Sequence, residues 1–237
     1  VLRGAEFEAQ RNYDKIGKPV DKTEWGMTPQ TVNAYYNPSN NEIVFPAAIF
    51  QPPYFDANAD DAVNYGGIGM VIGHEMTHGF DDQGSQFDAN GNLSNWWTAQ
   101  DAENFKNNSK RFVEQYGKFE VVDSLTVNGE LTLGENIADL GGMIIAYSAF
   151  KKATANKKDE MIDGLSADKR FFINFAQIWR THYRQDETIQ RLYTDPHSPA
   201  VARVIVVLSN FPEFYKAFNV TEKNKMFIPE NERCVMW

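Results

Sequence analysis

The apolar residues of this chain recur at helical spacing over much of its length. From Asn64 to Phe80, the apolar side chains Ile68, Ile72 and Met76 fall four residues apart and the series ends on Phe80 itself, which predicts one helix with a single apolar stripe. Such a stripe is typical of a helix that packs one face against the body of a domain. We therefore expect the apolar face of the 64–80 helix to be buried and the opposite face to be accessible.

Five more segments carry helical patterning or helix-start signals. Thr98-Ala-Gln-Asp101 fits a capping box, followed by Phe105, Phe112 and Tyr116 on one inward face. Ser198-Pro199 places a preferred cap residue before a preferred first helical residue. The helices predicted in this way cover about 98–116, 133–152, 171–183, 199–208 and 211–218.

Strand signals are few and lie mostly near the start of the chain. Two β-rich segments, 31–36 and 42–45, flank a run of turn residues at 37–41 and predict a hairpin, and a two-residue hairpin turn fits 127–130. The first thirty residues read as an irregular surface lead-in, and 151–168 as a charged connection. The pattern predicts a single domain over 1–237, mainly α (α+β), with a small β-sheet near the N-terminus.

Composition narrows the classes of protein. Hydrophobic residues make up 42% and charged residues 23%, as in globular domains. The formal net charge of −9 argues against a nucleic-acid partner. No apolar stretch reaches the 18 or more residues of a transmembrane helix. The single cysteine, Cys234, excludes a disulfide within the chain and a thiolate metal site.

The segment His74-Glu-Met-Thr-His78 carries the chemistry of the chain. Two histidines at i and i+4 lie about 40° apart around a helix, so both imidazoles reach one ion. Glu75 lies beside them on the wheel, where a carboxylate can hold a water molecule. These residues predict a metal site on the face of the 64–80 helix opposite its apolar stripe.

A catalytic zinc site needs a third protein ligand and an open position. Glu135, near the start of the apolar 133–152 helix, is the best candidate, and Asp139 follows one turn later on the same face. A favourable helix dipole explains an acidic residue at Glu135 alone, but not the pair. Metal-bound histidines donate their second ring nitrogen to a carboxylate, a role that suits Asp139 and also Asp81.

The motif at 64–82 resembles the neprilysin/endothelin-converting-enzyme family of zinc metallopeptidases, which includes bacterial oligopeptidases. The resemblance covers about residues 25–237. It extends through Val32–Tyr36, Val44–Pro46, Gln51–Pro53, Gly134–Asp139, Asn174–Trp179 and Asp195–Pro199.

The resemblance implies a thermolysin-like zincin domain with its zinc site between two helices, and it implies a role for each matching residue. One zinc ion per chain would bind His74, His78 and Glu135, with Glu75 as general base and Asp139 orienting a ligand. Asn33 and Ala34 would pair with the substrate backbone along an edge strand, His197 would stabilise the oxyanion, and Arg203 would grip a substrate carbonyl. The implied hydrophobic S1′ pocket consists of Tyr54, Met70, Val71, Ile178 and Trp179.

The expected function is therefore zinc-dependent endopeptidase cleavage of oligopeptides before a hydrophobic residue. Two alternatives are a structural zinc module and a peptide-binding domain without effective turnover. Family members carry a helical region upstream that closes over the cleft, and the sequence lacks it, so we expect the C-terminal part of a longer polypeptide. An extracytoplasmic location, secreted, periplasmic or membrane-anchored through that region, is favoured over the cytoplasm.

Overall fold

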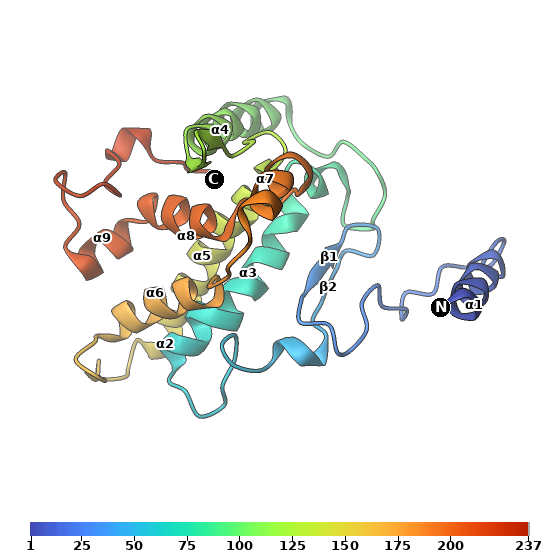
Figure 1. Cartoon of the computed structure of the whole chain (residues 1–237), viewed down its shortest axis with the longest axis horizontal. Helices are drawn as coiled ribbons and strands as arrows, with labels where there is room; N and C mark the ends of the chain where they lie inside the picture. Colours follow the sequence, from blue (N-terminus) through green and yellow to red (C-terminus); the bar gives the residue numbers. More distant parts are fainter. Residues whose placement is uncertain (237) are drawn as a thin grey trace.

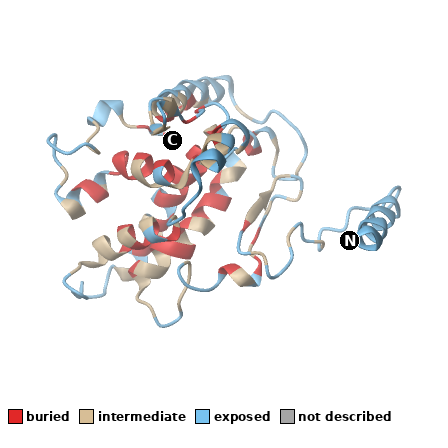
Figure 2. Ribbon diagram, in the orientation of Figure 1, coloured by how far each residue is buried: buried red, intermediate tan, exposed pale blue. Residues whose placement is uncertain are grey.

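The fold is built around helix α5 (Leu133–Thr154), in which every residue from Asn136 to Met143 is buried. A helix that is apolar nearly all round must be covered on several sides, and α3, α4 and α8 pack against it. Figure 1 shows α5 passing behind α3 and α8, and Figure 2 shows the buried residues gathered along these helices. The centre of the molecule is therefore a layer of helices, as the sequence predicts.

The computed structural model describes residues 1–236, so that Trp237 lies outside it. Its two sheets are antiparallel hairpins, β1–β2 and β3–β4. The strands are β1 (Tyr35–Asn37), β2 (Glu42–Val44), β3 (Glu120–Val122) and β4 (Leu125–Thr126). The α-helices besides α5 are α1 (Leu2–Tyr13), α2 (Asp61–Asn64), α3 (Met70–Thr77), α4 (Ala99–Gly117), α6 (Ala167–Ile178), α7 (Gln185–Thr194), α8 (Ala200–Ser209) and α9 (Pro212–Phe218).

The predicted 64–80 helix is present, but its buried face differs from the prediction. It is divided into α2, a π-helical turn at Tyr65–Gly69, α3 and a final 3-10 turn at His78–Phe80. Met76 and Phe80 are about half exposed and Ile72 is partly buried, so Ile68 is the one buried residue of the predicted stripe. The face that packs on α5 instead carries Met70, Gly73, His74 and Thr77, which meet Gly141 and Gly142 of α5.

The aromatic segment after residue 166 forms a shorter helix than predicted, followed by a second one. Helix α6 starts at Ala167, where the Ser166 side chain caps it, and it ends at Ile178 rather than at 183. Phe172 stacks on Tyr147 of α5 at 5.5 Å between ring centroids, which anchors α6 in the core. Helix α7 was not predicted because Leu192 is its one buried residue, so its sequence shows no apolar stripe.

Four other predicted helices are confirmed within a few residues. Thr98 caps α4 by accepting a hydrogen bond from the Asp101 N–H, as the capping box predicts. Helices α5 and α9 begin within one residue of the predicted start. Helix α8 begins at Ala200 with Pro199 as its N-cap, and the predicted capping hydroxyl of Ser198 makes no bond to the helix.

The first hairpin is confirmed and the second is displaced. Strands β1 and β2 pair in the register Tyr35↔Val44, with the turn inside the predicted 37–41 segment. The second hairpin turns at Asp123 and Ser124, which both have positive φ, and not at 127–130. That backbone conformation is the one a tight two-residue hairpin requires.

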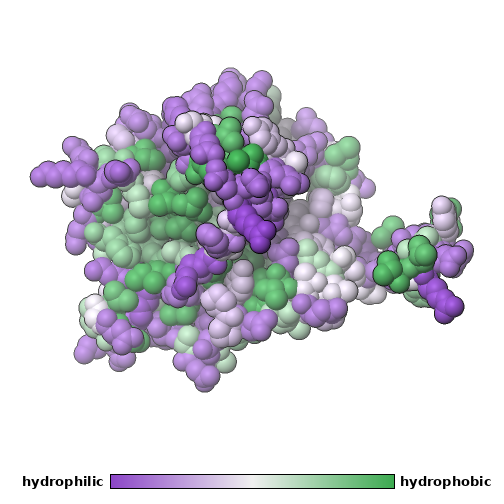
Figure 3. Space-filling view, in the orientation of Figure 1, coloured by the Kyte–Doolittle hydropathy of each residue, from purple (hydrophilic) through white to green (hydrophobic). Residues whose placement is uncertain are grey.

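The first part of the predicted irregular lead-in is helical (α1), whereas residues 14–30 have no regular structure and are mostly exposed, as predicted. None of the residues of α1 is buried, and Figure 1 shows it apart from the helical body. Hydrophobic side chains such as Leu2 and Phe7 are therefore exposed, and Figure 3 shows green atoms over this helix. Good helix formers such as Ala, Leu, Glu, Gln and Arg fill this segment, so local propensity accounts for the helix.

None of the helices within residues 1–236 combines the length and the apolar character that crossing a membrane requires.

Candidate metal centre

Two glycines bring α3 and α5 close enough to share one site. A Cβ atom on Gly142 would lie 2.6 Å from the backbone nitrogen of His74, and one on Gly73 would lie 2.7 Å from the Gly142 carbonyl oxygen. Both separations are shorter than any side chain tolerates, so the two backbones touch only because neither residue has a side chain. This contact sets His74 of α3, and His78 directly after α3, opposite the acidic residues of α5.

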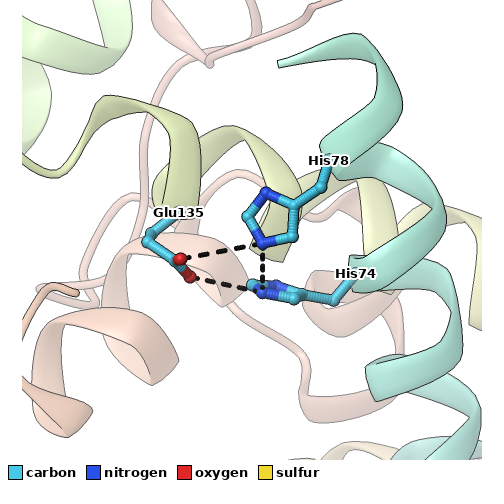
Figure 4. A group of neighbouring side chains, drawn as sticks. All are labelled: His74, His78 and Glu135. Atoms are coloured by element: carbon cyan, nitrogen blue, oxygen red, sulfur yellow. Dashed lines mark hydrogen bonds and ion pairs between the residues drawn. The ribbon is translucent and has the colours of Figure 1, made fainter. Parts of the chain in front are cut away.

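His74, His78 and Glu135 point their ligand atoms at one place (Figure 4). The two Nε2 atoms are 3.0 Å apart, and the Glu135 carboxylate oxygens lie 3.2 Å from His74 Nε2 and 3.6 Å from His78 Nε2. All three ligand atoms fall within 4.8 Å of one another. The structure therefore brings together the three residues that the sequence predicts as ligands.

The other ring nitrogen of each histidine faces a carboxylate. His78 Nδ1 lies 2.6 Å from Asp81 Oδ2, and the opposite Asp81 oxygen accepts the backbone N–H groups of Gln83 and Gly84. His74 Nδ1 lies 2.9 Å from Asp139 Oδ1, although its N–H is not well aligned with that oxygen. Carboxylates in these positions favour protons on both Nδ1 atoms and leave both Nε2 lone pairs facing the shared point.

Two lone pairs at 3.0 Å repel each other unless a proton or a metal cation lies between them. Burial disfavours a charged imidazole, but the neighbouring Asp139 and Glu135 carboxylates outweigh it and raise the pKa of His74 to about 9. Burial alone would raise the pKa of Glu135, yet contacts from His197 and His74 hold it well below its usual range. The site therefore favours positive charge at its centre, as a divalent cation would supply.

Glu75 lies next to this point without being one of its three ligand residues. It is 5% exposed and lines the cavity, and no residue within 1–236 makes a hydrogen bond or an ion pair with its carboxylate. Burial raises the pKa of Glu75 above its ordinary value. A buried carboxylate with no partner is costly, so its position calls for a role toward a bound molecule.

His197 and Arg203 contact the acidic residues of the site. The Arg203 guanidinium donates two hydrogen bonds to Asp139, at 2.7 and 2.6 Å, and its charge lies 3.9 Å from the centre of the Trp179 ring. His197 lies between Asp195, 2.7 Å from its Nδ1, and Glu135, 3.2 Å from its Nε2. The hydrogen bond with Glu135 raises the pKa of His197.

Sequence reasoning left Asp195 without a role, although it lies in the Asp195–Pro199 motif. Its position two residues before His197 could have indicated this role, because Asp side chains often accept a hydrogen bond from the backbone N–H two residues further along the chain.

A cavity of about 450 Å³ opens onto these groups. Of the predicted substrate-binding residues, the structure places Asn33, Ala34, Tyr54, Met70, Val71 and Trp179 in its lining, together with Arg203. Ile178 is buried in the core beside Trp179 and is not in that lining. A volume of this size lies within the range typical of ligand sites.

We predict that Gly142→Ala weakens zinc binding by about 10- to 100-fold, the range seen when the support of a metal ligand is disturbed. The new methyl group would push α3 away from α5 at His74. Zinc titration against a competing chelator measures the change. Gly117→Ala is the matched control, because nothing lies within 4 Å of its added Cβ. Equal affinities for Gly142→Ala and the unsubstituted chain would contradict the role of this contact.

A family model and several known proteins match the chain. The model described as Peptidase family M13 matches residues 33–234. Neprilysin from Homo sapiens is 43% identical over 242 residues, and an endothelin-converting enzyme homolog from Locusta migratoria is 44% identical over 239 residues. Each match covers 100% of this chain and 32% of the relative. The chain thus spans about a third of the length of these relatives.

A solved structure shares the fold. The zinc metalloprotease ZMP1 of Mycobacterium tuberculosis, in complex with an inhibitor, superposes with a TM-score of 0.93 at 50% sequence identity. The match covers 96% of this chain and 36% of that one. It confirms the mainly α, zincin-type fold expected from the sequence.

Proposed function

The chain belongs to Peptidase family M13, and from this premise we propose that it is the catalytic part of a zinc-dependent endopeptidase that hydrolyses oligopeptides. The observation that carries the proposal is the buried, unpartnered Glu75 carboxylate beside three convergent metal-ligand side chains. A structural metal site has no use for such a group, whereas hydrolysis requires a base at this place.

The donor set fits zinc. Two imidazole nitrogens and one carboxylate are the ligands of a common class of catalytic zinc site, which leaves a position open for water or substrate. His74, His78 and Glu135 would hold one ion per chain, with Asp139 and Asp81 fixing the two imidazoles. Zinc, when bound, acts as a Lewis acid that makes water a better nucleophile and polarises a carbonyl group.

Glu75 would take a proton from the attacking water and return it to the leaving amine. A general base works best when its pKa approaches the working pH, and the raised pKa of Glu75 moves it in that direction. Its carboxylate makes no competing bond within residues 1–236, so it can accept the proton without first losing a partner.

His197 would stabilise the negative charge that develops on the substrate oxygen. Its Nδ1 is held by Asp195, which directs Nε2 toward the centre of the site, and its raised pKa favours the charged, donating form. Arg203 would bind a substrate carbonyl close by, held in place by Asp139 and the Trp179 ring. Preorganised donors of this type contribute about 3–4 kcal/mol to catalysis.

The substrate backbone would lie along Asn33 and Ala34, just before strand β1. No backbone partner for either residue is found in the described part of the chain, which leaves their polar groups available to an extended peptide. Tyr54, Met70, Val71 and Trp179, with Ile178 behind them, would form the apolar pocket. We propose that it selects a hydrophobic residue immediately after the cleaved bond.

The test is hydrolysis of fluorogenic peptides that differ only in the residue after the scissile bond. We expect cleavage with leucine or phenylalanine there, at least about tenfold slower cleavage with aspartate, loss of activity with 1,10-phenanthroline, and recovery with added zinc. Zinc binding without cleavage of any peptide would overturn the proposal in favour of a binding domain. Cleavage that survives complete metal removal would overturn the metal mechanism.

An extracytoplasmic location is also a proposal. It is supported by a relative at 44% identity that bears the name Membrane metallo-endopeptidase-like 1. Fractionation of the cells that make the protein tests it, and recovery of the protein in the cytosolic fraction alone would overturn it.

A further inference from the structure

A buried hydrogen bond joins the helix that carries Glu135 to the turn that carries His197. The Ser198 hydroxyl donates to Asn136 Oδ1 at 2.7 Å. Asn136 is completely buried and Ser198 is 4% exposed. Each partner is the immediate neighbour in sequence of a residue in the site, so the bond lies directly behind the Glu135–His197 contact.

The bond does not serve the helix that follows Ser198. The sequence pattern places Ser198 as a cap of α8, but Pro199 is the N-cap and no side chain caps this helix. The hydroxyl is directed across the fold to a residue 62 positions away. Because the buried hydroxyl bonds to a distant residue and not to its own helix, it fixes the position of the turn before α8 relative to α5.

The Asn136 end of the bond is rigid. Its Nδ2 donates to Thr132 Oγ1 at 2.9 Å, and that hydroxyl donates to the Asn128 carbonyl. Thr132 is 3% exposed and is the N-cap residue of α5. The chain of bonds therefore ties the Ser198 hydroxyl to the start of the helix that presents Glu135.

The His197 end has few other attachments. About half of the His197 side chain is exposed, and Asp195, which holds its Nδ1, belongs to the same turn. Asp195 also pairs with Arg191 of α7 at 2.6 Å, but α7 itself buries only Leu192. Between Asp195 and Pro199, Ser198 is the one buried residue. Without its bond to Asn136, the turn could shift as a unit with its internal contacts intact.

We propose that Asn136 and Ser198 are positioning residues whose hydrogen bond holds His197 at its working distance from Glu135. The inference rests on the proposed function, because it assigns the pair to the placement of the oxyanion-stabilising imidazole. Neither residue lines the cavity at the metal centre. Displacement of a catalytic group by about 1 Å costs up to about 100-fold in rate.

The test compares Ser198→Ala, Asn136→Ala and the double variant. We expect Ser198→Ala to lower kcat about 10- to 100-fold, with KM changed less than about twofold and zinc still bound at one per chain. The double variant should be no slower than Asn136→Ala, because Asn136→Ala already removes the bond that Ser198→Ala removes. Ser109→Ala is the matched control, since this buried hydroxyl donates at 2.8 Å within α4, away from the site.

A second measurement does not depend on activity. The ring C–H signals of the four histidines are followed by NMR, with the exposed His182 as an internal reference. Ser198→Ala should shift or broaden the His197 signals and leave those of His182 in place. Unchanged His197 signals with unchanged kcat would overturn the inference, as would an equal effect in Ser109→Ala. If the unsubstituted protein cleaves no peptide, the proposed function fails, and the NMR result alone decides whether the pair positions His197.

Discussion

Glu75→Gln is expected to lower kcat about 10³- to 10⁴-fold, which corresponds to about 4–5.5 kcal/mol in the barrier. Glutamine keeps the shape of the side chain but cannot take a proton at neutral pH. The Glu75 side chain is buried beside the metal-ligand cluster and makes no hydrogen bond or ion pair with residues 1–236, so the substitution breaks no such bond of the folded chain. The loss should therefore appear in turnover, with zinc content and peptide binding retained.

Steady-state hydrolysis of a fluorogenic peptide, combined with metal analysis of the same sample, measures this effect. Glu114→Gln is the control, because it makes the same change on the exposed side of α4. The variant should bind zinc and a substrate-like inhibitor as the unsubstituted protein does. More than about a tenth of the original kcat in Glu75→Gln would remove Glu75 from the role of general base.

The parts of the site that sequence reasoning could assemble are those fixed by local geometry. Two histidines four residues apart must share one face of any helix, so His74 and His78 converge whatever surrounds them. Glu135 and Asp139 follow the same rule on α5, and an acidic pair in a buried helix needs a partner. The class of site could thus be predicted before any tertiary contact was known.

The burial of the metal-binding helix could not be predicted in the same way. The four-residue apolar stripe predicts that Met76 and Phe80 face the core, yet both are about half exposed. The packed face is set by Gly73 and Gly142, whose contribution is the absence of side chains. The pattern of hydrophobic residues cannot predict a close contact between glycines, because a glycine has no apolar side chain to contribute to the pattern.

The network behind His197 was also beyond sequence reasoning, for a different reason. A serine before proline at the start of a helix is a strong local signal for a cap, and it was read as one. The bond of Ser198 to Asn136 depends on a partner 62 residues away. Polar side chains with several possible partners are placed by the tertiary fold and not by their neighbours. Helix α7 was not predicted for another reason: Leu192 is the one residue that it buries, so no apolar stripe marks it.

Glu135→Ala is expected to weaken zinc binding by at least about 100-fold and to abolish hydrolysis at micromolar zinc. The free energy of a structural zinc site, about 10–16 kcal/mol, is shared among its four ligands, so one ligand is worth about 2.5–4 kcal/mol, on the order of 100-fold or more in affinity. Glu135 also contributes the negative charge opposite His74, His78 and Arg203. Its removal leaves two imidazoles without the carboxylate that completes the set, and it places more positive charge where the cation would lie.

Asp139→Asn separates the loss of a ligand from the loss of the group that orients a ligand. Asp139 contacts His74 Nδ1 and holds Arg203 with two hydrogen bonds, but it contributes no atom to the three-ligand cluster. We expect its zinc affinity to fall only about 10- to 100-fold, as for other carboxylates that orient a metal-bound histidine. Both affinities are measured by competition with a chelator of known strength at constant pH. If Glu135→Ala binds zinc as tightly as Asp139→Asn, then Glu135 is not a zinc ligand.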